Sequence, residues 1–410
     1  MLVGLSLDKK RRWETEEHLE ELSLLADTAG ALVVERVIQE RRRIDSATFI
    51  GRGKVAMLSE RVEDNDIDLV IFDDDLSPAQ IANLEKALNK KILDRSGLIL
   101  DIFARRAKTR EARTQVELAQ LNYLLPRLTR QWTHLSRQEG GIGTRGPGET
   151  QLEVDRRLIR KRIRALTKQL DKIKKHREVR RKNRDLTFRV ALVGYPNAGK
   201  STLLNTLTDS DVFVEDRLFA TLDATIRRLN RVGDRPAILL IDTVGFIRKL
   251  PHHLVASFMS TLEEAKVADL LLHIVDVSHP HLKEHISVVN AVLHDLHISE
   301  KPSLYVFNKI DKLEQKGLLA NLKSEFQPAI FVSAVKGLFL EDLKHKLGSY
   351  ACDTVLEWTL RLPLKESGLL AGIYELAQVL ETNYVDSMIE IKLRASKSNA
   401  GRIKRMTRTS

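Results

Sequence analysis

The sequence predicts a multidomain α/β protein, and three observations lead to that fold class. In the first hundred residues, short runs rich in branched apolar side chains alternate with helical patterns. The same alternation resumes from Thr187, whereas the region between has the periodicity of two long helices. Because strands that alternate with helices build parallel sheets covered by helices, we expect two sheet-containing regions joined by a helical segment.

The N-terminal region, residues 1–105, is predicted to be an α/β domain. Its apolar runs are bounded by turn-forming residues, which indicates short strands between amphipathic helices. The expected strands are residues 2–7, 31–36, 68–72 and 91–93, and the expected helices are residues 16–26, 54–63, 78–88 and 98–107.

Residues 106–184 are predicted to form an antiparallel helical hairpin. Each helix repeats apolar residues at alternating spacings of three and four, the pattern of a coiled-coil seam. Residues 139–148 contain too much glycine for regular structure and form the expected tip. After the tip, Thr150 can cap the second helix while Glu153 reaches back to it. The seam residues are Leu118, Leu121, Leu125 and Leu128 in the first helix and Ile159, Ile163, Leu166, Leu170 and Ile173 in the second.

Two further regions complete the predicted architecture. Residues 185–348 are interpreted as a nucleotide-binding α/β domain, and residues 349–410 as a small C-terminal α/β domain with a basic tail. In the first, the expected strands are 188–193, 226–231, 238–241, 270–275, 303–307 and 329–332, and the helices are 201–208, 254–266, 283–296 and 340–346. In the second, a strand from Val355 is followed by a helix over 368–381 and a strand over 388–393.

The positive charge is concentrated in one segment. The 410 residues carry a formal net charge of +11, but residues 156–184 alone hold 15 Lys and Arg against two acids. The other residues therefore sum to −2. A solvated coiled-coil face is the alternative interpretation, but such faces normally mix both signs. We therefore expect this segment to contact a polyanion, with nucleic acid the usual candidate.

Cysteine content and hydropathy exclude several classes of protein. The single cysteine, Cys352, excludes an internal disulfide framework and a cysteine-rich zinc site, which fits a reducing cytosol. No apolar run approaches the about 18 residues that a membrane span needs. Apolar residues 1–7 precede basic residues 9–12, the reverse of a signal peptide. We therefore expect a cytoplasmic protein whose membrane contact is at most peripheral.

Residues 194–201 form a complete phosphate-loop pattern between an apolar strand and a helix. Glycines allow the backbone to curl so that its N–H groups point at the phosphates of a nucleotide. Lys200 is expected to neutralise the β- and γ-phosphates, and Ser201 to bind Mg²⁺. The nucleotide-binding residues predicted here are Gly194, Tyr195, Pro196, Asn197, Ala198, Gly199, Lys200, Ser201 and Thr202.

Three later segments favour guanine as the base. Asn308, Lys309 and Asp311 follow an apolar strand, and the Asp311 carboxylate can accept the two hydrogen bonds that guanine offers and adenine does not. Asp242 is placed to hold Mg²⁺ through water, and the Gly245 amide to meet the γ-phosphate. The backbone amides of Ser333 and Ala334 can bind the guanine oxygen.

In this order the motifs resemble those of translation-factor-class GTPases. The resemblance implies a switch threonine that binds Mg²⁺; Thr221 is favoured and Thr225 is the alternative. The expected catalytic residues are Lys200, Thr221 and Gly245. Phe246 occupies the position where a Ras-like enzyme carries glutamine, so we expect slow intrinsic hydrolysis that rises when a partner orders the switch segments.

Across residues 4–393 the sequence resembles the HflX family of GTPases. The resemblance rests on residues 51–54, 72–80, 93–103 and 107–118 and on the Gly-Pro-Gly-Glu-Thr loop at 146–150. It implies binding to the large ribosomal subunit, splitting of stalled or stress-inactivated ribosomes, and ATP use by the N-terminal domain. Val55 follows Lys54, so residues 51–54 lack the hydroxyl of a phosphate loop and are interpreted as a helix-opening turn.

The expected partner is ribosomal RNA rather than DNA, and the protein is expected to be a monomer. Aromatic residues make up only 5% of the chain, so contacts to phosphate are favoured over base stacking. The alternative function is a regulatory or ribosome-assembly GTPase whose basic hairpin binds another acidic partner. The predicted RNA-binding residues are Arg145, Arg156, Arg157, Arg160, Lys161, Arg164 and Lys168.

Three other features are expected to have no role in catalysis. His279, His281 and His285 are expected to be solvated surface histidines, and Cys352 a small buried residue. Residues 392–408 carry seven basic residues and no acid, and either add RNA contacts or form a frayed end.

Overall fold

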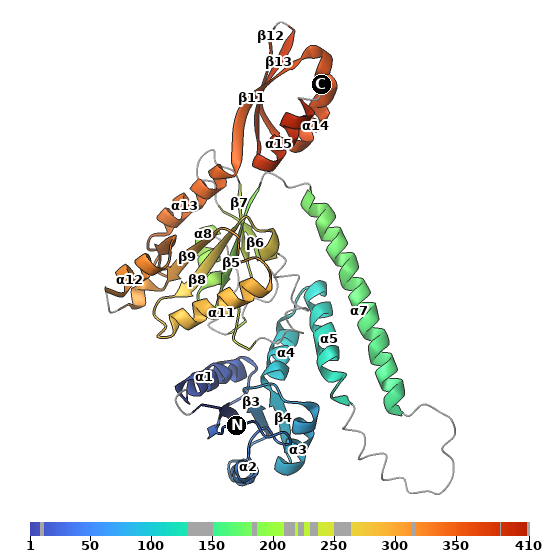
Figure 1. The fold of residues 1–410 in the computed structure, drawn as a ribbon, viewed down its shortest axis with the longest axis vertical. Coiled ribbons are helices and arrows are strands. Elements are labelled where there is room, and N and C mark those ends of the chain that lie inside the picture. The colour runs from blue at the N-terminus through green and yellow to red at the C-terminus, as the bar shows by residue number, and fades with distance from the viewer. Residues whose placement is uncertain are drawn as a thin grey trace. The chain divides into compact units, whose positions relative to one another are not determined.

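The computed structural model describes residues 1–8, 12–128, 151–182, 187–208, 218–219, 225–229, 237–249, 264–313, 317–385 and 387–407. Two compact units are present (Figure 1). The first comprises Met1–Ile173, Glu215–Asp223 and Ile247–Ser260, and the second comprises Lys174–Val214, Ala224–Phe246 and Thr261–Ser410. The mixed α/β fold class is confirmed, while the division into four parts at residues 105, 184 and 348 stays a prediction.

The first unit is built on a parallel sheet with strand order β2-β1-β3-β4, which we call the N-terminal sheet. Its helices bury apolar faces against it, with Leu19, Leu58 and Leu84 at most 1% exposed. The elements are β1 Leu2–Ser6, α1 Arg12–Thr28, β2 Arg36–Glu40, α2 Arg52–Asp64, β3 Leu69–Phe72, α3 Pro78–Leu88, β4 Lys91–Asp94 and α4 Arg95–Arg106.

The strand predicted over residues 31–36 lies elsewhere. β2 begins at Arg36, where the register of the parallel ladder pairs it with Leu2. Leu32 is 89% exposed and Val34 55%, so these apolar residues face solvent and have no strand beside them. Branched side chains favour a strand only where a partner strand supplies the hydrogen bonds. The helix-opening turn at Gly51 is confirmed, because Gly51 is the N-cap of α2.

Helices α5 Arg110–Leu124 and α7 Gln151–Lys182 correspond to the predicted hairpin. The seam of α7 is confirmed, because Ile159, Ile163 and Ile173 are partly buried and Leu166 is 2% exposed. Arg162 joins the helices by two hydrogen bonds to Glu117, of 2.6 and 2.9 Å. The tip at residues 139–148 and the Thr150 cap lie outside the described residues. No helix in the described ranges is both long and apolar enough to cross a membrane.

The second unit contains a six-stranded sheet in the order β10-β9-β8-β5-β7-β6, parallel except for β6. All six strands were predicted. The helix predicted over residues 254–266 falls largely outside the described residues, and α12 was not predicted. The elements are β5 Phe188–Gly194, α8 Lys200–Thr208, β6 Thr225–Arg228, β7 Ile238–Asp242, β8 Leu270–Asp276, α11 Leu282–Asp295, β9 Ser303–Asn308, a 3₁₀ turn Ile310–Lys312, α12 Gly317–Glu325, β10 Ala329–Phe331 and α13 Leu340–Asp353.

The C-terminal residues form a three-stranded antiparallel sheet, β11-β13-β12. The helix predicted over 368–381 is wrong beyond residue 376, because residues from Gln378 pair with β13 as the antiparallel strand β12. The basic tail is helical and buries Ile403 completely. The elements are β11 Val355–Pro363, a 3₁₀ segment Leu364–Leu369, α14 Leu370–Leu376, β12 Gln378–Val385, β13 Met388–Ser396 and α15 Lys397–Met406.

Asp94 at the end of β4 joins the N-terminal sheet to α5. The side chain is fully buried, and its carboxylate accepts hydrogen bonds from the Tyr123 hydroxyl (2.7 Å), the Gly97 amide (2.9 Å) and the Arg127 guanidinium (2.8 Å). Burial raises the pKa of the Tyr123 hydroxyl, and the charge of Asp94 acts in the same direction. Helix α5 is therefore attached to the sheet by a buried polar cluster.

Replacing this hydroxyl should destabilise the first unit. We expect Tyr123→Phe to lower the free energy of unfolding by about 1.5 kcal/mol at neutral pH, because Asp94 loses a buried donor. The raised pKa means that the folded protein keeps a proton that the unfolded chain loses above about pH 10. This stabilisation is therefore complete below that pH and is lost above it. Urea unfolding of the wild type and of Tyr123→Phe, at neutral pH and above about pH 10, measures the difference in the free energy of unfolding.

The matched control is Tyr374→Phe, because Tyr374 is 56% exposed. It should change stability by less than about 0.5 kcal/mol. Equal stability of Tyr123→Phe and the wild type at neutral pH would contradict the role assigned to the Asp94 cluster.

Candidate functional site

Four segments meet at one edge of the six-stranded sheet, because the carboxyl ends of parallel strands lie together. β5 ends at Gly194 and leads into α8, β7 ends at Asp242, β9 ends at Asn308, and β10 is followed by Ser333 and Ala334. The structure therefore brings together the predicted residues at 194–202, 242–245, 308–311 and 333–334. Thr221 and Arg145 lie outside the described residues.

The loop between β5 and α8 requires glycine at two positions. At Gly194 an added Cβ would lie 2.3 Å from the carbonyl oxygen of Ile274. Gly199 has a φ of +90°, and a Cβ there would lie 2.3 Å from Nδ2 of Asn308. The loop backbone thus approaches β8 and the end of β9 more closely than any side chain would permit.

Lys200 points back into this loop. Its ammonium group donates hydrogen bonds to the carbonyl oxygens of Gly194 (3.1 Å) and Tyr195 (2.8 Å), and the side chain is only 7% exposed. Burial lowers the pKa of Lys200 to about 8, while the Asp242 carboxylate opposes that shift. The loop therefore encloses a cation whose charge a bound phosphate would stabilise.

Ser201 and Asp242 supply two oxygen atoms beside each other. The Ser201 hydroxyl donates to Oδ2 of Asp242 at 2.6 Å, and Asp242 is fully buried. Hydroxyl and carboxylate oxygens are the ligands that Mg²⁺ prefers, so these two residues fit that ion. Thr225 lies on β6, where its Cα is opposite Asp242 in the antiparallel ladder.

Asn308 connects the phosphate loop to the segment after β10. Its Nδ2 donates to the Ala198 carbonyl oxygen and its Oδ1 accepts from the Ala334 amide, both at 3.0 Å. Lys309 has a left-handed φ of 66° and forms an ion pair with Asp276 at 2.6 Å.

The Asp311 carboxylate accepts a hydrogen bond from the Ser333 hydroxyl. This contact brings the predicted guanine acceptor beside the backbone amides predicted to bind the guanine oxygen. The Ser333 hydroxyl also accepts from the Lys336 amide at 3.1 Å, and the Ser333 side chain is fully buried.

The segment after β7 folds onto the phosphate loop. The Phe246 amide donates to the Gly194 carbonyl oxygen at 3.1 Å, and a Cβ added at Gly245 would lie 2.9 Å from Cα of Pro196. Phe246 is 1% exposed. Its ring is a packing group and offers no atom that could orient water.

Two contacts that support the loops were not predicted from the sequence. The Thr243 hydroxyl donates to the Leu192 carbonyl oxygen at 2.6 Å, and the Thr206 hydroxyl to that of Ala334 at 3.2 Å. A single threonine in a sequence gives no signal for such a bond, because its partner is a backbone group chosen by the tertiary fold.

The interpretation of Cys352 as a buried residue was wrong, and His279, His281 and His285 are only partly exposed. The His285 ring stacks on Tyr195 of the phosphate loop with centroids 3.7 Å apart, and His279 lies 4.2 Å from His285. Because these rings pack against each other and against Tyr195, the side chains of His279 and His285 are only partly exposed to solvent. Cys352 is exposed, because the core-facing position of α13 at that turn is taken by Ala351.

A phosphate loop, an Asp-Thr-Val-Gly segment and an Asn-Lys-Ile-Asp segment along one parallel sheet define a P-loop GTPase. Family models agree: residues 189–309 match "50S ribosome-binding GTPase", residues 16–104 "GTP-binding GTPase N-terminal" and residues 106–184 "GTP-binding GTPase Middle Region". The chain belongs to the HflX family of GTPases and is a hydrolase acting on GTP.

Relatives of this family match most of the chain. GTPase HflX of Flavobacterium psychrophilum is 52% identical over 76% of this chain and 75% of its own length. GTPase HflX of Lacrimispora saccharolytica is 48% identical over 95% and 91%. Among solved structures, a GTP-binding protein from the archaeon Sulfolobus solfataricus in complex with GDP is 26% identical, covering 86% of this chain and 99% of that one with a TM-score of 0.44.

An alanine at position 199 should abolish nucleotide binding. The new Cβ would collide with Asn308 and the residue would keep a left-handed backbone, so we expect a cost of about 3 kcal/mol and roughly 100-fold weaker GDP binding. Gly317→Ala is the matched control, because an added Cβ there meets nothing within 4 Å. Fluorescent GDP titration measures both variants. Unchanged affinity in Gly199→Ala would contradict the close approach.

The pKa of Lys200 leads to a prediction about pH. A bound phosphate favours the charged ammonium, so a lysine with a pKa of about 8 should take up a proton when GDP binds at pH 9. GDP affinity should then fall about tenfold for each pH unit above 8, because the deprotonated protein binds weakly. Calorimetry in two buffers of different ionisation enthalpy measures the uptake. Binding at pH 9 without proton exchange would contradict this prediction.

Proposed function

We propose that this GTPase binds the large ribosomal subunit through phosphate contacts of its basic helix α7 and uses GTP to split stalled or stress-inactivated ribosomes. The observation that carries the proposal is the exposed basic face of α7. The match of residues 189–309 to the family model described as "50S ribosome-binding GTPase" supports the choice of partner.

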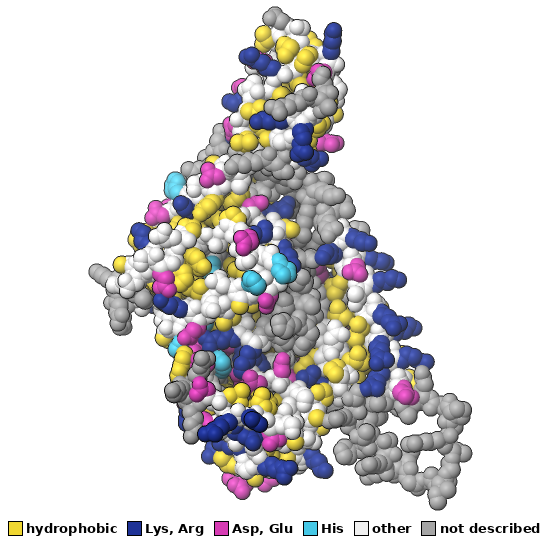
Figure 2. Space-filling view, viewed as in Figure 1, with side chains coloured by type: hydrophobic (Ala, Val, Ile, Leu, Met, Phe, Trp, Pro, Cys, Tyr) yellow, Lys and Arg dark blue, Asp and Glu magenta, His cyan; other side chains and the backbone are white. Residues whose placement is uncertain are grey.

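The basic side chains of α7 point away from its apolar seam. Figure 2 shows lysines and arginines along the exposed side of this helix. Arg156 is partly buried, and Arg162 is bound to Glu117 in α5, so neither is the best test of RNA contact. The exposed basic residues that were predicted to bind RNA are Arg157, Arg160, Lys161, Arg164 and Lys168.

An extended row of cations on one helix suits a phosphate backbone. Each phosphate contact releases counterions, which gives sequence-independent binding that weakens steeply with salt. An A-form RNA helix is recognised mainly by shape and backbone, since side chains cannot read its deep major groove. The hairpin would therefore recognise an RNA surface, and a cleft in that surface, by shape and by phosphate contacts rather than by base sequence.

The nucleotide chemistry follows from the site geometry. Lys200 and the loop amides would neutralise the β- and γ-phosphates, and Asp311 would accept hydrogen bonds from guanine. Gly245 would donate its amide to the γ-phosphate. Since the Phe246 ring cannot orient the attacking water, hydrolysis is expected to be slow until a bound ribosome orders the switch segments.

Mg²⁺ would be held by Ser201, by Thr221 and, through water, by Asp242. When bound, it neutralises charge on the β- and γ-oxygens. The GTP-bound form would favour the ribosome complex, and hydrolysis would permit release. ATP use by the N-terminal region, which the family resemblance implies, is a separate proposal. Residues 51–54 do not add support for it, because they form the N-cap and first turn of α2.

Removing charge from α7 should weaken ribosome binding without affecting the nucleotide. We expect a variant with Arg160, Lys161, Arg164 and Lys168 replaced by glutamine to lower the slope of log affinity against log salt by about three. Cosedimentation with purified large subunits and a non-hydrolysable GTP analogue, across a salt series, measures this slope. GDP affinity should stay unchanged.

The matched control removes four exposed cations that lie outside α7: Arg42, Lys86, Lys91 and Lys323. Its slope should equal that of the wild type. No binding of the wild type to large subunits at low salt would remove the proposal and favour the alternative, a regulatory or assembly GTPase whose hairpin binds another acidic partner. Equal loss in both variants would contradict a specific role for α7.

A further inference from the structure

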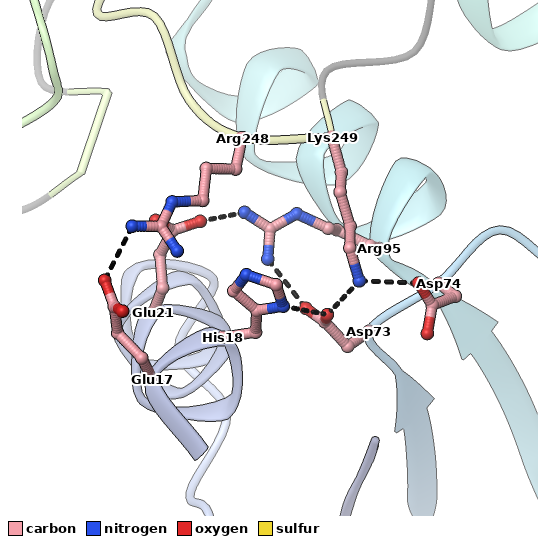
Figure 3. A network of polar contacts seen from close by, with 8 residues as sticks. All are labelled: Glu17, His18, Glu21, Asp73, Asp74, Arg95, Arg248 and Lys249. Carbon is pink, nitrogen blue, oxygen red and sulfur yellow. Dashed lines mark hydrogen bonds and ion pairs between the residues drawn. The ribbon is translucent and has the colours of Figure 1, made fainter. Parts of the chain in front are cut away.

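The residues that directly follow the Asp242–Gly245 motif are bound to the N-terminal sheet and to α1 (Figure 3). Arg248 donates to Glu17 of α1 at 2.7 Å. The ammonium group of Lys249 lies 2.5 Å from a carboxylate oxygen of Asp73 and 2.5 Å from one of Asp74. Both cations belong to the first compact unit, although Gly245, three residues before Arg248, belongs to the second.

The carboxylates stand where this type of sheet offers a binding crevice. In the strand order β2-β1-β3-β4, successive strands are added on one side of β1 and then on the other, and ligands of doubly wound folds bind outside the carboxyl ends of the strands at such a point. Asp73 and Asp74 directly follow β3. The ammonium group of Lys249 contacts both carboxylates at this edge of the sheet.

These contacts help to balance charges that are buried or partly buried. Asp73 is 1% exposed and binds Arg95, itself 2% exposed, at 2.8 Å, while Arg95 also contacts Glu21. His18 faces Asp73 at 3.7 Å, but burial and then the charges of Lys249, Arg248 and Arg95 lower its pKa to about 4, so it is neutral. Four carboxylates (Glu17, Glu21, Asp73 and Asp74) thus face three cations, and two of those come from residues 248 and 249.

A second segment is anchored in the same unit by an apolar contact. The Phe219 ring packs edge-on against Phe103 of α4, with centroids 4.7 Å apart and planes at 75°. Phe219 is 3% exposed and its neighbour Leu218 6%. In the sequence, Phe219 precedes by two residues the threonine at 221 that was predicted to bind Mg²⁺.

Both anchors carry backbone strain. Phe219 has a φ of 57° and Lys249 a φ of 50°, a left-handed conformation that is unfavourable for a residue with a side chain. Such strain persists only where surrounding contacts fix the backbone, and it gathers at switch regions. In each segment, the residue with the left-handed backbone (Phe219 or Lys249) is also the one whose side chain contacts the first unit.

We propose that Lys249 is a positioning residue for GTP hydrolysis, through which the N-terminal sheet and its helices hold the segment that follows Gly245. This inference rests on the proposed assignment of Gly245 as a γ-phosphate ligand. The Phe246 amide is bound to Gly194 and Gly245 packs on Pro196, so the anchored segment already lies on the phosphate loop. The anchors pre-organise the segment and thereby favour GTP over GDP.

The test compares affinities of the full-length protein for GDP and for a non-hydrolysable GTP analogue. Lys249→Met keeps the aliphatic stem and removes the charge, and we expect it to weaken binding of the analogue about tenfold relative to GDP, since freed residues must be ordered again. The rate constant kcat for GTP should fall by a similar factor. Lys249→Arg should retain both values, and Asp74→Ala combined with Lys249→Met should cause no further loss.

Lys283→Met is the matched control, because Lys283 forms an exposed ion pair with Glu325 and should change neither ratio nor kcat. An unchanged or increased preference of Lys249→Met for the analogue would overturn the proposal, as would an equal loss of GDP affinity. Asp311→Asn in the same assay tests the guanine site separately. If it retains GDP affinity, the nucleotide-site assignment fails whatever Lys249→Met shows.

Discussion

The double hydrogen bond of Asn308 is the constraint on which the nucleotide site depends. One amide side chain satisfies the Ala198 carbonyl and the Ala334 amide, so the phosphate loop, the guanine motif and the segment after β10 keep one geometry. Its packing against Gly199 leaves no space for a side chain there. Phosphate and base recognition are therefore not independent, because a displacement of either loop breaks a bond to the other.

The buried carboxylates and the exposed cations of α7 have different roles in this chain. Carboxylates such as Asp73 and Asp94 are at most 1% exposed, and each is compensated by a cation and by hydrogen bonds. An unpaired charge at those positions would cost several kcal/mol, so these acids fix structure. The cations of α7 are exposed and cost little to present. Exposed charges of this kind add little to stability, so their concentration on one helix is explained better by the proposed contact with a polyanion.

The sequence predicted those parts of the fold that local pattern determines. All six strands of the larger sheet, the seam of α7 and the residues from Gly194 to Ala334 that gather at one sheet edge follow from periodicity and motif. The predicted element bounds were wrong where pairing with a distant strand determines the structure. β2 starts where it pairs with Leu2, and β12 forms because β13 lies beside it. His285 stacks on Tyr195 across 90 residues of sequence, which no local pattern reveals.

The anchoring of Arg248 and Lys249 belongs to the same class of missed feature, and it changes how the motif before it is understood. Asp242 to Gly245 can be recognised from sequence because phosphate chemistry limits which residues serve there. The next four residues have no such limit, and their cations are explained only by acids more than 170 residues earlier. Lys249 follows Gly245 by only four residues, so the positions of the two residues are linked through a short stretch of backbone. Under the proposed function, a contact of Gly245 with the γ-phosphate and the contacts of Lys249 would act on the same short piece of chain, and any coupling between them would be reciprocal.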